Sequence, residues 1–316
     1  MKFYQINLLF LLVFALPFLG GCGNRYALHT KGRFVFGDTI PLLMRANTGD
    51  ADAQYKLAYY YLNTCRIDAD GTAMPLNEKE GIKWLRKAAK QEHAEAMCEL
   101  GRAYQNGRGV PEDKEEAVRW FRKSVEHGNA AALCALAQCY FDGLGVPEDK
   151  MEAVKLFRQA AEQGFPNGMY QLGHCYFKGE GVPEDKVEAV KWFRKCAELG
   201  FFPGQYMLGK CYYNGEGVLQ DKTEAILWYR KAAEIDQEAR FELIRCYLKD
   251  EYVPDETEME EWISLLRLWA ANDSVFFISG KRDEDFWNGL KQRQNQAAEL
   301  LREMEKKYPS NFAETI

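Results

Sequence analysis

Between residues 93 and 128, apolar side chains recur at helical spacing in two separate runs. In each run they lie three and four positions apart, which predicts one helix over residues 93–105 and a second from about residue 114 to residue 127. Glycines separate the two runs and follow the second, and glycine readily adopts the left-handed conformation that ends a helix. The segment is therefore predicted to be an antiparallel helix pair. Its apolar residues are Ala96, Met97, Leu100, Ala103 and Tyr104 in the first helix and Ala117, Val118, Trp120, Phe121 and Val125 in the second.

This helix pair repeats along the chain at a step of 36 residues. The sequence Gly-Val-Pro-Glu-Asp-Lys starts at Gly109, Gly145 and Gly181, and a degraded copy starts at Gly217. In each copy the Asp has a Glu three residues later, which is the spacing of a capping box, so the Asp is predicted to cap the second helix. A fixed period of this length is typical of a solenoid, in which each repeat buries its apolar faces against its neighbours. The capping pairs are Asp113/Glu116, Asp149/Glu152, Asp185/Glu188 and Asp221/Glu224.

Several positions of the repeat are expected to be packing positions. A small residue returns at one place in the first helix, which predicts close approach of the two helices there. A large residue returns at one place in the second helix. The small residues are Gly101, Ala137, Gly173 and Gly209, and the large ones are Trp84, Trp120, Leu156, Trp192 and Trp228.

The ends of the repeat array depart from the 36-residue step. Ala53, Leu57 and Ala58 match the first helix of the next repeat at a step of 43, so about seven extra residues are expected in the loop at residues 66–76. A last helical pattern over residues 283–307 breaks the period and carries Phe286, Leu290, Leu301 and Met304. It is predicted to cap the array, because a solenoid needs a terminal element with a polar outer face.

The repeat is similar to that of the Sel1-like repeat family, a relative of the tetratricopeptide repeat. Residues 116–123 read Glu-Ala-Val-Arg-Trp-Phe-Arg-Lys and residues 188–195 read Glu-Ala-Val-Lys-Trp-Phe-Arg-Lys, which matches the second-helix pattern of that family. The resemblance is strong over about residues 50–235. It implies an all-α, right-handed α/α superhelical solenoid of about six 36-residue helix pairs, followed by a C-terminal capping helix. We expect the solenoid to span residues 39–272 and the capping helix and tail to span residues 273–316.

The N-terminus has the pattern of a bacterial lipoprotein signal. Lys2 precedes an apolar run over residues 8–19, which is too short to span a bilayer. The run ends in Leu-Gly-Gly-Cys, with Cys22 as the expected site of lipidation and as the mature N-terminus; the alternative is an ordinary cleaved signal in which Cys22 is incidental. Residues 1–21 are then a signal peptide and residues 22–38 a lipidated tether. We expect a periplasm-facing protein of the cell envelope, held by lipid alone, with the outer membrane preferred because Gly23 and not Asp follows the cysteine.

Charge and candidate chemistry narrow the function. The formal net charge is −6, with 41 basic and 47 acidic residues, which argues against a nucleic-acid-binding surface. The four histidines do not form ligand pairs at helical spacing, and His93 and His127 are expected to be solvated at repeat junctions, so no metal site is predicted. No nucleophile motif or phosphate-binding loop is found, and we expect neither enzymatic activity nor a cofactor.

The cysteines are interpreted in two ways. Cys139, Cys175, Cys211 and Cys246 share one repeat position, where a small buried apolar side chain is expected. Stacked repeats lie about 10 Å apart, too far for these residues to bridge one another. A pair across two helices, such as Cys175 with Cys196, remains the alternative. Cysteine-rich members of the family carry one disulfide per repeat between cysteines eight residues apart, a spacing that this chain lacks.

A stripe on the first helices is the candidate binding surface. We call it the first-helix stripe; it consists of the positions equivalent to 98, 102 and 105 in each repeat, which lie on one helix face. By resemblance to tetratricopeptide repeats it lines the concave side. Two later repeats place aromatic rings beside cations there, and such residues are typical binding anchors, although aromatics at helical spacing also pack in cores. The candidate residues are Tyr170, His174, Phe177, Tyr206, Lys210 and Tyr213.

The sequence therefore predicts a scaffold or adaptor that binds a protein or peptide in its groove and is anchored in the envelope. Two alternatives remain open at this stage. One is a cell-wall or β-lactam-directed hydrolase of the cysteine-rich repeat type, which would need a nucleophile and a base together in a cleft. The other is a purely structural spacer of the envelope.

Overall fold

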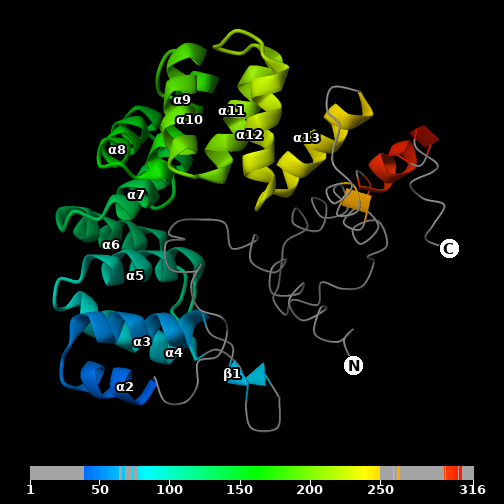
Figure 1. Cartoon of the computed structure of the whole chain (residues 1–316). Coiled ribbons are helices and arrows are strands. Elements are labelled where there is room, and N and C mark those ends of the chain that lie inside the picture. The colour runs from blue at the N-terminus through cyan, green and yellow to red at the C-terminus, as the bar shows by residue number, and fades with distance from the viewer. Residues whose placement is uncertain are drawn as a thin grey trace, which may run out of the picture. The chain divides into compact units, whose positions relative to one another are not determined.

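The structure, a computed structural model, describes residues 39–63, 66–67, 73–74, 77–249, 259, 262–263, 295, 297–304 and 306–307 (Figure 1). The expected signal peptide, the tether and Cys22 lie outside these residues. The elements are α2 (Thr39–Asn47), α3 (Ala51–Asn63), β1 (Arg66–Ile67), β2 (Ala73–Met74), α4 (Glu78–Ala89), α5 (Ala94–Asn106), α6 (Lys114–Glu126), α7 (Ala130–Asp142), α8 (Lys150–Glu162), α9 (Pro166–Lys178), α10 (Lys186–Glu198), α11 (Phe202–Asn214), α12 (Lys222–Ala233) and α13 (Gln237–Leu248).

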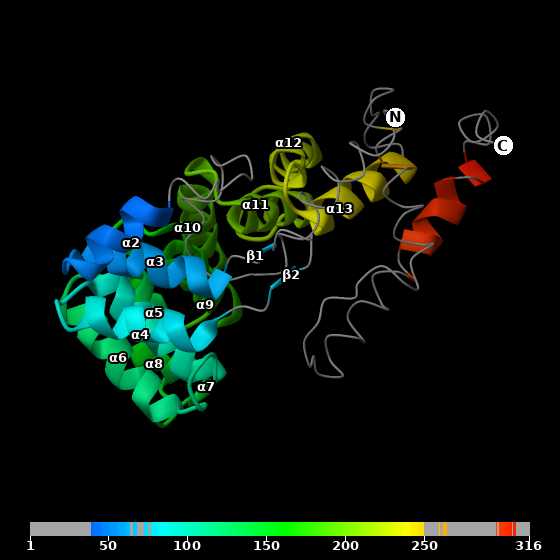
Figure 2. The same ribbon diagram turned by 90° about the horizontal axis from the view of Figure 1, so that it is seen from below.

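The first compact unit of the fold, which ends at Cys196, is a stack of antiparallel helix pairs. α3 pairs with α4, α5 with α6 and α7 with α8, and the second helix of each pair also packs against the first helix of the next. Figures 1 and 2 show this order for α3, α4 and α5, with α2 against α3 at the start of the stack. The predicted helical repeat solenoid is confirmed.

The second compact unit begins at Ala197 and continues the same pattern with α11, α12 and α13. α13 packs on α12, and its buried cluster takes in Phe241 and Ile244 together with Trp262 and Ile263. Residues 297–304 are helical, and three of their side chains belong to the same buried cluster. This described part of the last helix covers apolar surface as predicted, whereas Phe286 and Leu290 lie outside the described residues. The three side chains are Ala297, Leu300 and Met304.

The enlarged loop between α3 and α4 contains the only strands among the described residues. β1 and β2 pair antiparallel, with Arg66 opposite Met74 and Ile67 opposite Ala73. The expectation of an all-α chain missed this short pair. Its residues do not belong to the repeated helix pattern, and they satisfy some of their backbone groups by pairing with each other.

The small residue of each first helix lies against an aromatic ring of the second helix. A Cβ atom on Gly101 would lie 2.4 Å from Cε1 of Phe121, closer than side-chain carbons ever approach. Gly209 faces Tyr229 in the same way, with 2.7 Å from its ideal Cβ to Cδ1. The predicted close approach of the two helices is therefore confirmed, and its reason is a buried ring that occupies the space of a Cβ atom.

The glycines between the two helices of a repeat have two different roles. Gly107 ends α5 in the left-handed conformation, with φ of 65°. Gly145 also has a positive φ, and a Cβ atom there would lie 2.2 Å from the carbonyl oxygen of Lys114, at the start of the second helix of the preceding repeat. The second glycine is thus required by contact between repeats as well as by the turn.

Each second helix begins at the predicted aspartate cap. Oδ1 of Asp113 accepts the backbone N–H of Glu116 at 2.9 Å, and Asp149, Asp185 and Asp221 do the same in their repeats. The return bond of a full capping box is replaced, because the N–H of Asp113 donates to the carbonyl of Tyr104 at 2.9 Å. Glu116 instead forms an ion pair with Arg119. The cap therefore also fixes the loop between the two helices.

A side-chain hydrogen bond between neighbouring repeats recurs at the 36-residue step. The guanidinium of an arginine in one second helix donates to the hydroxyl of a tyrosine in the next first helix, 18 residues later. The distances are 2.9 Å for Arg86 with Tyr104, 3.0 Å for Arg122 with Tyr140 and 2.6 Å for Arg158 with Tyr176.

Candidate partner-binding surface

α9 presents the first half of the first-helix stripe. Tyr170, His174 and Phe177 lie on one face of this helix and are all half-buried. The ring of Tyr170 lies 6.3 Å from that of His174 and 6.0 Å from that of Phe193 on α10, measured between centroids. These side chains therefore rest partly on the core of their own repeat and expose the remaining part.

Phe177 is held between a ring and a cation. Its centroid lies 6.2 Å from that of Phe193, and Nζ of Lys186 lies 5.1 Å from the Phe177 centroid. The same ring-and-lysine contact occurs in the preceding repeat, where Lys150 lies 4.8 Å from Phe141. Sequence reasoning missed this pairing, although the signal was present as an aromatic residue nine positions before the first lysine of α8, α10 and α12.

His174 is the titratable group of this half. Burial lowers the pKa of His174 below its ordinary value, nearby Glu180 partly opposes this effect, and Lys178 adds to it. At neutral pH the imidazole is therefore uncharged, so one nitrogen can donate and the other can accept a hydrogen bond. The expectation of a cation at this position holds only under acidic conditions.

α11 presents the second half of the stripe, in the second compact unit. Tyr206 is half-buried, its ring lies 5.9 Å from that of Tyr229, and burial raises its pKa to about 12 with a further contribution from Glu242. Lys210 is exposed. Nζ of Lys249 donates to the hydroxyl of Tyr213 at 3.0 Å, and Lys222 lies 5.7 Å from the centre of the same ring.

The first-helix stripe is not exposed to solvent along its whole length. Cys98 is 2% exposed and Cys134 is 3% exposed, although they occupy the same repeat position as Tyr170 and Tyr206. The expectation that this position faces solvent in every repeat was therefore wrong. A cysteine is short enough to remain inside the repeat interface, whereas the longer tyrosine reaches its edge.

All seven described cysteines are buried and none is in a disulfide, so Cys175 and Cys196 are not bridged. Cys139, Cys175, Cys211 and Cys246 are buried at their shared position as expected. No group of three or more potential metal ligands occurs among the described residues. His127 is exposed as expected, but His93 is not.

In the part of the chain that the structure describes, no helix combines the length and the apolarity needed to cross a membrane.

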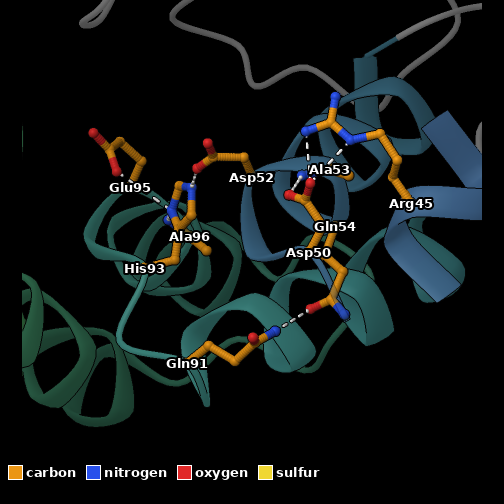
Figure 3. Close-up of polar contacts among 9 residues, drawn as sticks. All are labelled: Arg45, Asp50, Asp52, Ala53, Gln54, Gln91, His93, Glu95 and Ala96. Carbon is orange, nitrogen blue, oxygen red and sulfur yellow. Dashed lines mark hydrogen bonds and ion pairs between the residues drawn. The ribbon is translucent and has the colours of Figure 1, made fainter. Parts of the chain in front are cut away.

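His93 belongs to a polar cluster at the junction of the first repeats, which the sequence analysis missed (Figure 3). Its side chain is 10% exposed and caps α5, at the same position where Asn129 caps α7. In the same cluster Gln91 donates to Oε1 of Gln54, and Gln54 donates to the carbonyl of Ala46. The signal in the sequence was the alignment of His93 with the cap residue of the next repeat.

Comparison with known proteins identifies the family. A family model described as the Sel1 repeat matches residues 51–63, 68–93, 94–129, 130–165, 166–201 and 203–236, which together make up more than half of the chain. The chain belongs to the Sel1 repeat family. Sel1 repeat proteins are generally scaffolds for protein–protein interactions. The first two matched segments hold α3 and α4, and each of the four later segments corresponds to one helix pair of the structure.

Two solved Sel1-type structures are similar over most of this chain. A Sel1 repeat protein from Oxalobacter formigenes is 30% identical with a TM-score of 0.63, and the match covers 72% of this chain and 91% of that one. The protein c5321, a protective antigen of uropathogenic Escherichia coli, is 30% identical with a TM-score of 0.59. That match covers 85% of this chain but only 56% of the antigen. No curated protein sequence matches the chain.

Proposed function

We propose that this Sel1 repeat protein is a non-enzymatic scaffold of the bacterial cell envelope. In this proposal it is anchored by a lipid on Cys22 and binds another protein or a peptide through the first-helix stripe. The observation that carries the binding site is the set of half-exposed aromatic rings on α9 and α11, in which Phe177 and Tyr213 each have a lysine close by. Such side chains combine apolar contact area with a polar or charged group, as interaction hot spots do.

The contacts of these rings support a preformed binding surface. Phe177 lies against Phe193, and Tyr206 lies against Tyr229, so neither ring needs to be ordered when a partner arrives. A side chain that is already fixed loses little conformational entropy on binding. The uncharged imidazole of His174 adds a hydrogen-bonding group between the two rings of α9.

The envelope location is proposed from the N-terminal pattern. The apolar run over residues 8–19 and the Leu-Gly-Gly-Cys sequence ending at Cys22 are those of a lipoprotein signal. A lipid on Cys22 would hold the repeats beside a membrane without any helix that crosses it. We place the repeats in the periplasm and prefer the outer membrane.

Site-specific crosslinking in the native envelope tests the binding surface. A photo-reactive amino acid replaces Lys210 in the full chain, and a second variant carries it at Lys155, an exposed residue on the second-helix side that forms an ion pair with Glu152. The proposal expects a discrete adduct from position 210 and none from position 155. Arg158 is unsuitable as a control because it bonds Tyr176.

The aromatic anchors are then tested in the background of the crosslinker at position 210. Phe177→Ala and Tyr206→Ala should each weaken capture of the same partner by about 2 kcal/mol, or roughly 30-fold. Since both rings also contact the core, circular dichroism must show that each variant remains folded. Lys210→Glu is made in the chain without the crosslinker. Because the side chain at position 210 is exposed, this substitution cannot open a cavity. It should weaken the binding of a partner that contacts Lys210. Unchanged adducts in folded Phe177→Ala and Tyr206→Ala proteins would refute the stripe as the binding surface.

A further inference from the structure

His93 lies at the junction of the first two repeats, between α3 and the start of α5 (Figure 3). Its ring packs against that of Tyr55 of α3 in a tilted arrangement, with 4.8 Å between the centroids. Because helices of two adjacent repeats enclose the imidazole, its position is fixed, and its two nitrogens face different partners.

The two nitrogens are both satisfied when the ring is neutral. Nδ1 accepts the backbone N–H of Ala96 at 3.3 Å and so caps α5, while Nε2 lies 3.1 Å from Oδ1 of Asp52 on α3. Nδ1 can accept only if it carries no proton, which assigns the proton of the neutral ring to Nε2. The neutral side chain therefore caps one repeat and donates a hydrogen bond to the other.

A second group lies close to Nδ1, and its hydrogen-bonding requirement is opposite to that of the Ala96 amide. Oε2 of Glu95 lies 3.3 Å from it, and a carboxylate can only accept a hydrogen bond. The amide of Ala96 and the carboxylate of Glu95 thus compete for one nitrogen, and the protonation state of the ring decides which of them is satisfied. Asp52 and Tyr55 on α3 also face the ring, and burial raises the pKa of Tyr55 so that it stays neutral.

We propose that His93 is a proton-sensitive helix cap. When the ring takes up one proton from solvent on Nδ1, it releases the N–H of Ala96 and pairs with Glu95, while Nε2 keeps its contact with Asp52. Imidazole is the side chain whose charge ordinarily changes between about pH 5 and pH 8. Ala96 is fully buried, so its released N–H has no ready replacement partner. A positive charge at the start of α5 also opposes the helix dipole, so acidification loosens the first turn of α5.

The next repeat supplies an internal reference for this cap. Asn129 occupies the position of His93 and accepts the N–H of Ala132 at 3.0 Å. An amide side chain does not titrate in this range, so the cap of α7 is independent of pH. Of these two helix starts, only that of α5 should respond to acid.

Hydrogen exchange of the full chain at pH 7.5 and pH 5.5 tests the inference. Each rate is divided by the intrinsic rate of the unfolded amide at the same pH, which leaves a protection factor. The protection of Ala96 should fall about fivefold on acidification, which corresponds to the loss of one typical cap, while that of Ala132 stays constant. In His93→Asn, which copies the cap of α7, Ala96 should be equally protected at both pH values.

A second variant distinguishes protonation of His93 from a non-specific effect of low pH on the chain. Asp52→Asn removes a carboxylate that favours the charged ring, so the loss of protection should move to lower pH. Equal protection of Ala96 at both pH values in the native chain would overturn the proposal. It would also be overturned by a parallel loss at Ala132, or by persistence of the loss in His93→Asn. If His93→Asn does not fold, the ¹⁵N shifts of His93 in the native chain decide, because the proposal requires the Nε2–H tautomer at pH 7.5.

Discussion

A Cβ atom on Gly173 would lie 2.8 Å from Cε1 of Phe193, a ring that is itself fully buried. Gly173→Leu should therefore force the ring or the backbone to move and should destabilise the chain by about 1–3 kcal/mol. Gly173→Ala should cost less, since Ala137 already occupies the equivalent place in its own repeat, where Phe157, the equivalent of Phe193, is also buried. Urea denaturation followed by circular dichroism measures both. Equal losses for the two variants would show that the repeats are wrongly aligned.

The reverse substitution provides the matched control for this position. Ala137→Gly removes one methyl group and adds backbone freedom in a helix, which should cost about 1 kcal/mol. The ring of Phe157 should move toward the position that Phe193 has beside Gly173. A stabilising effect of Ala137→Gly would mean that the methyl group strains its repeat.

The indole N–H of Trp228 donates to Oε1 of Glu224 at 2.9 Å, whereas that of Trp120 is buried without a hydrogen-bond partner among the described residues. This difference between the two indole groups arises from the residue that precedes each tryptophan. Arg119 holds Glu116 in an exposed ion pair, but the equivalent residue before Trp228 is Leu227. Arg119→Leu should free Glu116 to accept the N–H of Trp120.

The expected gain from Arg119→Leu is about 1 kcal/mol, because a buried donor gains its acceptor while an exposed ion pair contributes little. The Trp120 indole proton should shift downfield in the NMR spectrum, and the melting temperature should rise. Leu227→Lys is the opposite test and should shift the Trp228 indole proton upfield. An unchanged Trp120 signal would contradict the competition for the carboxylate.

The buried thiols should be unreactive in the native chain. Burial raises the pKa of Cys139 to about 11 and that of Cys175 to about 12, so almost no thiolate forms at pH 8. In a variant with Cys22 and Cys65 replaced by Ser, a disulfide reagent such as DTNB should label the native protein negligibly at pH 8. The same protein in guanidinium should react at all remaining cysteines, whose unfolded pKa is about 8.5. Rapid native labelling would contradict the observed burial.

The same pKa shifts predict a loss of stability in alkali. Above about pH 8.5 the unfolded chain releases thiol protons that the folded chain retains, so the free energy of unfolding falls as pH rises. Below that pH the folded and unfolded chains both hold these protons, so the thiols should not make the free energy of unfolding depend on pH. Denaturation midpoints at pH 7, 8.5 and 10, compared with those of Cys175→Ala, separate this contribution from that of other groups.

The lipid anchor is tested at Cys22. Cys22→Ser should leave an unprocessed precursor that takes up no labelled fatty acid, because the acceptor thiol is absent. Cys65→Ser is the matched control and should be processed and labelled normally. Normal processing and labelling of Cys22→Ser would exclude the proposed lipoprotein.

The helix pairs and their ends were predictable because they depend on neighbours close in sequence. Asp113 caps α6 through an amide three residues away, and Gly107 ends α5 through its own backbone conformation. The 36-residue step then placed Gly173 and its equivalents at one packing position without any knowledge of the partner ring. In a periodic chain the same local interactions recur in every repeat, so the fold class and the order of the helices followed from the pattern alone.

Burial along the first-helix stripe was decided by tertiary structure, because the same repeat position holds side chains of different length. Cys98 remains inside the interface between repeats, while Tyr206 extends to its edge. The environment of His93 also depends on contacts across repeats, with Asp52 lying 41 residues earlier in the chain. Periodicity identifies which positions are equivalent, but the exposure and charge of each side chain depend on the size and polarity of the residues that the neighbouring repeat places against it.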